Sequence, residues 1–157
     1  METAQISRWK IQCDPDATRE AFSRVAIGSP EKCGCANCLN FVVGRSRAYP
    51  SEVLSVFDQL GIDSRKESEI WHTHRDVNGL HHYGGFFHFI GAIESGRDAK
   101  NKSNGHVTFD FERIGEHFEW GLTSNVALVP KTFANASVTQ LEFATQIPWV
   151  IDTPESD

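Results

Sequence analysis

The spacing of apolar residues changes along the chain near Gly61. Before it, residues 15–26 and 50–60 repeat apolar side chains at the intervals of three and four that are typical of an amphipathic helix. Asp14 precedes the first stretch as a favourable N-cap, and Gly61 follows the second as a left-handed C-cap. We therefore predict two helices, preceded by a short strand over residues 6–12, where the side chains alternate.

After Gly61 the apolar period falls to two, which is typical of strands. Residues 69–75 and 80–93 are joined across Asn78-Gly79, the dipeptide most characteristic of a two-residue hairpin turn. The remaining predictions are strands at residues 106–111, 125–129 and 138–151, with a break near Pro148, and a solvated loop over residues 94–105.

Residues 39–43 form an apolar run, and their pattern leaves a short helix and a buried strand both open. No repeat or Pro-rich linker separates the helical part from the part rich in strands. We therefore predict one domain over residues 1–157. Its predicted class is α+β, in which an N-terminal strand, helices and a cysteine knuckle pack on a mostly antiparallel sheet.

The charge balance and the N-terminus limit the possible partners. Fifteen Lys and Arg against 21 Asp and Glu give a net charge of -6, which disfavours nucleic acid because phosphate binding requires a concentrated basic surface. No apolar run is long enough for a signal peptide or a membrane span. We expect a cytoplasmic protein with neither nucleic acid nor membrane as its partner.

The four cysteines of the chain are candidate metal ligands: Cys33, Cys35 and Cys38 are closely spaced, and Cys13 ends the first predicted strand. In a reducing compartment, cysteines serve metal or redox chemistry more often than disulfides. Four thiolates complete the tetrahedral shell of a structural zinc ion, and Gly34 permits a sharp turn between ligands. We predict a zinc site. Thiol exchange at Cys35 and Cys38, an iron–sulfur cluster and unrelated thiols are the alternatives.

Five of the seven histidines lie between residues 72 and 88. If the hairpin turns at Asn78-Gly79, alternation places five side chains on one face: His72, His74, Asp76, His81 and Tyr83. Three imidazoles and a carboxylate could hold a catalytic metal with a bound water. A polar face that contacts solvent or a ligand, and histidines satisfied within the core, are the two other interpretations.

Several segments resemble those of small uncharacterised bacterial proteins. They are the Cys-x-Cys-x-x-Cys stretch at residues 33–41, residues 49–54 with 60–63, residues 83–91, and residues 141–143 with 148–150. The resemblance covers nearly the whole chain. It implies a bacterial source and no particular activity.

Two classes of function follow. The first, which we favour, is a zinc-stabilised binding or interaction module whose aromatic and histidine-rich surface contacts a small molecule or a protein. The second is a metal-dependent hydrolase-like enzyme that uses the histidine-rich hairpin, with the cysteine site structural. The chain contains no nucleophile elbow, no phosphate-binding loop of the Walker type and no His-Glu-x-x-His helix.

Overall fold

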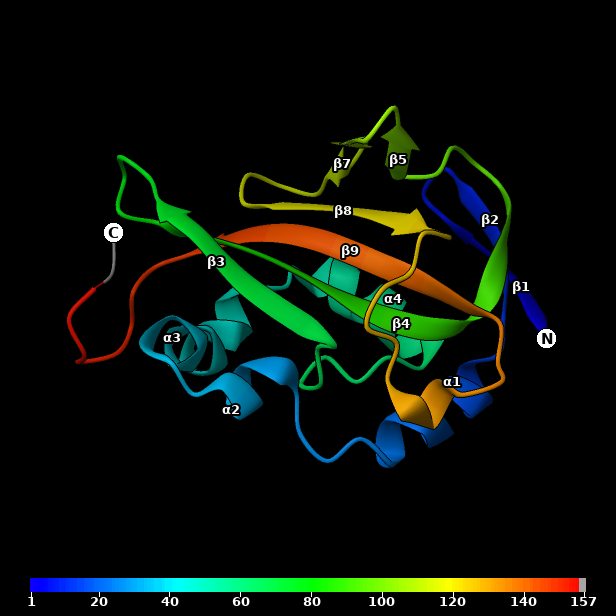
Figure 1. Cartoon of the computed structure of the whole chain (residues 1–157), viewed down its shortest axis with the longest axis horizontal. Coiled ribbons are helices and arrows are strands. Elements are labelled where there is room, and N and C mark those ends of the chain that lie inside the picture. The colour runs from blue at the N-terminus through cyan, green and yellow to red at the C-terminus, as the bar shows by residue number, and fades with distance from the viewer. Residues whose placement is uncertain (156–157) are drawn as a thin grey trace.

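The computed structural model describes residues 1–155, in which helices cover one side of a bent sheet (Figure 1). In chain order the elements are β1 (Glu2–Ile6), β2 (Trp9–Cys13), α1 (Pro15–Ser23), α2 (Ser29–Cys33), α3 (Ala36–Gly44), the 3-10 turn η1 (Arg45–Arg47), α4 (Ser51–Leu60), β3 (Glu69–Arg75), β4 (His81–Ser95), β5 (Lys100–Ser103), β6 (His106–Phe109), β7 (Glu112–Arg113), β8 (Phe118–Thr123), the 3-10 turn η2 (Lys131–Phe133) and β9 (Val138–Ile147). The predicted α+β class with a mostly antiparallel sheet is confirmed.

The long strand β4 organises the sheet. The strand order of the sheet is β1-β2-β4-β9-β8-β7. One edge of β4 pairs with two strands, with β3 along its first half and with β2 along its second half. Strand β9 runs antiparallel to β4 over ten consecutive positions. In Figure 1, α1, α2 and α3 lie below β4 and β9, whereas β5 and β7 lie above them. We call the side away from the helices the open face.

Aromatic side chains fill the space between the sheet and the helices. Tyr49, just before α4, meets the rings of Phe87 and Phe143 at centroid distances of 5.9 and 5.3 Å. Phe57 of α4 lies 4.8 Å from Phe87, and Phe118 stacks on Phe143 at 5.8 Å. All five rings are buried. Such burial contributes roughly 1.5–3 kcal/mol for each large side chain and fixes which face of the sheet receives the helices.

The two helices predicted from their caps are confirmed. Helix α1 begins at Pro15, and the Ala17 N–H donates a 3.0 Å hydrogen bond to Asp14 Oδ1, although the helix ends at Ser23 rather than near residue 26. Helix α4 ends at Leu60, and its C-cap Gly61 has φ 84°. A Cβ at Gly61 would also collide with the Pro15 carbonyl, so this position needs glycine for its conformation and for its close approach to α1.

Three predictions outside the hairpin need correction. The single strand predicted at residues 6–12 is two strands, because Ser7 adopts a left-handed conformation with φ 52° and turns the chain between them. Residues 94–105 contain β5 in place of a continuous loop, and residues 125–129 are not a strand. The predicted break at Pro148 is confirmed, since β9 ends at Ile147.

The hairpin across Asn78-Gly79 is confirmed as β3 and β4, but its turn is longer than the two residues expected, because the Asp76 N–H donates to the Leu80 carbonyl at 2.8 Å. The apolar run at residues 39–43 is part of helix α3. No helix formed by residues 1–155 has the length and apolar character required to cross a membrane.

Candidate functional site

Three cysteines converge where α2 meets α3. Helix α2 ends at Cys33, Gly34 follows in the left-handed conformation with φ 68°, and Cys35 caps α3. The Sγ atoms of Cys33, Cys35 and Cys38 all lie within 4.8 Å of one another. Tetrahedral zinc with bonds of about 2.3 Å requires sulfur atoms about 3.8 Å apart. The three thiols, which we call the knuckle, therefore fit one zinc ion after a small movement.

The knuckle thiols share hydrogen bonds. The Cys38 N–H donates to Cys35 Sγ at 3.4 Å. Partial burial opposes ionisation of Cys35, but this N–H and the neighbouring thiols favour its thiolate, and the net result is a lowered pKa. Burial and contact with the other two sulfurs raise the pKa of Cys38. The Cys35 thiol therefore ionises more readily than an ordinary cysteine, and the Cys38 thiol beside it less readily.

Cys13 is not part of the knuckle. It ends β2 with its backbone between Glu2 of β1 and Gly91 of β4, and burial raises the pKa of its thiol. In Figure 1, β2 lies at the opposite end of the molecule from α2 and α3. The expected convergence of four cysteines is therefore corrected to three. Trp9, Ile11 and Cys13 are every second residue of β2, so their side chains share one face of the strand, and all three lie in the core.

Tyr83 joins the knuckle to the sheet. Its hydroxyl donates to the Asn37 carbonyl at 2.7 Å, and Asn40 Nδ2 donates to the same hydroxyl at 3.3 Å. Asn40 is completely buried and also accepts from the Val150 N–H at 2.7 Å. Burial raises the pKa of Tyr83 to about 12. Asn40 was not among the predicted site residues. It is the one polar residue in the apolar run at residues 39–43, and that contrast could have marked it as a buried hydrogen-bonding group.

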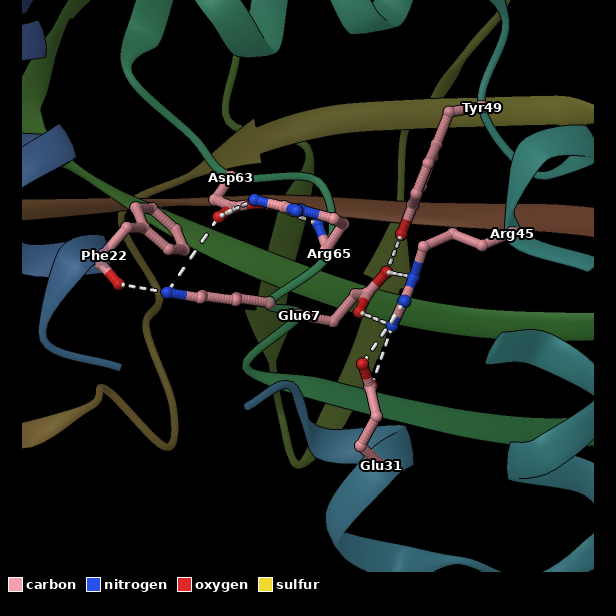
Figure 2. A network of polar contacts seen from close by, with 8 residues as sticks. Phe22, Glu31, Arg45, Tyr49, Asp63, Arg65 and Glu67 are labelled. Carbon is pink, nitrogen blue, oxygen red and sulfur yellow. Dashed lines mark hydrogen bonds and ion pairs between the residues drawn. The ribbon is translucent and has the colours of Figure 1, made fainter. Parts of the chain in front are cut away.

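An ionic network around Arg45 contacts the same helices (Figure 2). Arg45 donates to Glu31 of α2 at 2.8 Å and to both oxygens of Glu67, at 2.8 and 3.1 Å. The Tyr49 hydroxyl donates to Glu67 at 2.6 Å. Burial acts against the charge of Arg45, yet the two carboxylates raise its pKa above the ordinary value. This Arg45 network holds α2 and the end of α3 against the segment that leads into β3.

On the hairpin, His72 and His81 lie on the face toward the helices. His72 Nε2 and His81 Nδ1 are 2.8 Å apart, and the His72 ring meets the edge of Tyr83 with centroids 5.2 Å apart. Burial, followed by the neighbouring histidines, lowers the pKa of His72, and burial is the main cause of the lowered pKa of His81. Both rings therefore favour the neutral form and share one hydrogen bond.

His74 and Asp76 lie elsewhere. The His74 ring stacks on His82 with centroids 4.2 Å apart, and Asp76 Oδ2 lies 3.0 Å from His82 Nε2. The predicted shared face is therefore wrong. The observed register pairs His72 with Tyr83 and, after a shift, His74 with His82, whereas the expected two-residue turn would have paired His74 with Tyr83. Within residues 1–155, the knuckle is the only group of three or more His, Cys, Asp or Glu side chains whose ligand atoms lie close enough together to hold one metal ion.

The open face carries a groove of about 330 Å³ above the same strands. Trp71, Phe109 and Phe111 supply aromatic walls, while Gly84 and Ala144 form part of the floor. The sequence indicated aromatic residues and the unusual Gly84-Gly85 pair, but not that remote strands would assemble them around one cavity.

Comparisons of this chain with protein-family models, with curated proteins and with solved structures give no match.

Proposed function

We propose that the protein is a zinc-stabilised binding module in which Cys33, Cys35 and Cys38 hold the ion. The observation that carries the proposal is the convergence of the three Sγ atoms within 4.8 Å. Zinc accepts thiolate sulfur in a tetrahedral shell. Three protein ligands leave a fourth position for water or for a donor atom of a bound partner. A reducing compartment such as the cytoplasm would keep the three thiols available.

The surroundings of the knuckle favour a stabilising role for the ion. It would bridge the end of α2 and the start of α3, two short helices separated by Gly34 and Cys35. The contact of Tyr83 with Asn37 would pass this restraint on to β4. The hydrolase-like alternative depended on His72, His74, Asp76 and His81 sharing one face, and the register of β3 and β4 divides them between two.

Metal analysis of three single variants tests the proposal. We expect one zinc ion per chain in protein purified under reducing conditions, and loss of that zinc in Cys35→Ser and Cys38→Ser, because two thiolates bind zinc much more weakly than three. Cys13→Ala is the matched control and should retain the ion, since Cys13 lies outside the knuckle. Zinc retained in Cys35→Ser, zinc lost in Cys13→Ala, or iron found in place of zinc would each contradict the proposal.

A further inference from the structure

The sulfur atoms of the knuckle lie close enough to bond with one another as well as with an ion. A disulfide requires its sulfur atoms about 2.05 Å apart, whereas the ligands of one zinc ion keep theirs about 3.8 Å apart. The Sγ atoms of Cys33, Cys35 and Cys38 lie within 4.8 Å of one another, and all three are reduced thiols. A short movement therefore forms a disulfide, and a disulfide excludes the ion, because zinc binds thiolates.

The three thiols differ in their access to solvent. Cys33 and Cys35 are exposed, whereas Cys38 is 7% exposed. Cys35 also lies at the N-terminus of α3, where the Cys38 N–H donates to its sulfur at 3.4 Å. The reactive cysteines of proteins are partly exposed, and many lie at a helix N-terminus. Cys35 is therefore the thiol that a dissolved oxidant reaches first in a reactive position.

Cys38 is the disulfide partner that the helix offers to Cys35. Side chains three residues apart on a helix have Cβ atoms roughly 5–6 Å apart, and a disulfide requires roughly 3.5–4.5 Å. Cys35 precedes the helical residues, with φ -71° and ψ 165°, so its side chain moves toward Cys38 without unwinding α3. Cys33 ends a separate helix, α2, which the Arg45 network holds in place through Glu31.

We propose that the knuckle is also a site of reversible oxidation, at which a hydroperoxide joins Cys35 and Cys38 in a disulfide and zinc is released. The Cys35 sulfur attacks the peroxide: an S–O bond forms, the O–O bond breaks, and the leaving oxygen departs as water or an alcohol. The Cys38 sulfur then attacks the Cys35 sulfur, the S–O bond breaks and water leaves. The two protons come from the thiols, or from solvent where the sulfur was bound to zinc. The two sulfurs together lose the two electrons that the peroxide gains.

The release of zinc rests on the proposed function, whereas the disulfide does not require it. Disulfides in reducing compartments are usually transient and serve catalysis or redox sensing. The Arg45 network joins Glu31 of α2 to Glu67 without any sulfur atom, so the helices stay in place when the ion leaves. Oxidation thus switches metal binding off in a chain that remains folded.

Peroxide treatment of the full chain, with and without bound zinc, tests the inference. Hydrogen peroxide should lower the number of free thiols from four to two, because Cys13 and Cys33 remain, and the chain should lose the mass of two hydrogen atoms. Peptide mapping should place the bond between Cys35 and Cys38, and dithiothreitol should restore all four thiols. In the zinc-loaded chain, a chelating dye should record release of the ion at the rate at which the disulfide forms.

Single variants locate the reaction. Cys33→Ser should still form the disulfide, and Cys35→Ser should react at least about tenfold more slowly than the natural chain. In Cys38→Ser, Cys35 should continue to the sulfinic acid, because the thiol that resolves the first product is missing. Cys13→Ala is the matched control and should react like the natural chain, since Cys13 lies outside the knuckle.

Three results would overturn the inference: four free thiols after peroxide treatment, a disulfide that includes Cys33 or Cys13, or zinc retained by the oxidised chain. Its failure differs from failure of the proposed function. A chain that forms the Cys35–Cys38 disulfide but binds no zinc when reduced contradicts the proposed function and supports the oxidation site. A chain that binds zinc and keeps its thiols under peroxide does the reverse.

Discussion

The Arg45 network and the knuckle contact the same two helices but differ in how completely their polar groups are paired. In the network, the Glu67 side chain is fully buried, and every charge has an opposite charge within 2.8–3.1 Å. In the knuckle, Cys33 and Cys35 are exposed, and the three sulfur atoms lie within 4.8 Å of one another. The helices are therefore already held by the network, and an ion would enter a site that the fold has formed.

The open face of the sheet shows the same contrast. Toward one end, buried His88 has both ring nitrogens bonded, Nδ1 to Ser68 Oγ at 2.9 Å and Nε2 to Gln140 Oε1 at 3.0 Å. Further along that face, Glu119 lines the groove directly opposite Arg113 of β7, and among residues 1–155 neither side chain forms an ion pair. Fully paired polar groups contribute stability, whereas polar groups without a partner are the ones available to bind something else. The knuckle and the groove therefore carry the polar groups of the protein that are placed to bind another molecule or ion.

The largest expected effect is on the Arg45 network. Arg45→Met leaves the Glu67 carboxylate buried without its counter-charge, which should cost about 3–5 kcal/mol of unfolding free energy in denaturant titrations. The matched control is Arg65→Met, which removes the Arg65–Asp63 pair visible beside the network in Figure 2. Arg65 is 76% exposed on its side chain, so its loss should be undetectable. Equal losses in the two variants would mean that the network does not hold the helices.

A smaller effect is expected from His88 as pH falls. Burial lowers the pKa of His88 to about 4 from an ordinary value of 6.5. Between these two values the unfolded chain binds a proton that the folded chain does not, so this contribution to stability declines as pH drops from 6.5 to 4. The total loss is about 3 kcal/mol.

Urea unfolding at several pH values measures this loss. The free-energy advantage of the natural chain over His88→Gln should be largest above pH 6.5 and shrink by about 3 kcal/mol near pH 4. His106→Gln removes an exposed histidine from β6 and serves as the control. A difference between the natural chain and His88→Gln that does not change with pH would show that His88 titrates normally in the fold.

The fold was predictable where neighbours in sequence determine the structure. Asp14 caps α1 through the Ala17 N–H three residues away, and Gly61 ends α4 by its own backbone conformation. Asn78-Gly79 likewise fixed the position of the hairpin. Each of these interactions joins residues only a few positions apart in the sequence, so the residues that make it can be recognised without knowing the rest of the fold.

The candidate sites were less predictable because they depend on register and topology. The register shift between His72 and His74 moves His74 to another face, and nothing in the local sequence marks it. Cys13 could have been recognised as a core residue of its strand, since it continues the alternation of Trp9 and Ile11. Glu119 reaches the groove only because β8 pairs with β9 at Ala144, a contact between segments 25 residues apart.

The smallest effect on stability is expected when the knuckle is changed in zinc-free protein. Cys35→Ser should alter the unfolding free energy by no more than about 0.5 kcal/mol. Serine is itself a favourable N-cap, so it can accept the Cys38 N–H that Cys35 accepts now. The Arg45 network remains intact in this variant and continues to hold α2 and η1.

Zinc should increase the unfolding free energy of the natural chain more than that of this variant. An ion that binds only the folded state stabilises it by mass action, by about 2.7 kcal/mol when free zinc exceeds the dissociation constant a hundredfold. We expect that gain in the natural chain and little gain in Cys35→Ser at the same zinc concentration. Cys13→Ala should start from a lower stability, because Cys13 is buried in the core, and still gain the full increment. If the zinc-free natural chain were unfolded, the helices would depend on the ion, and the Arg45 network alone would not be sufficient to hold them.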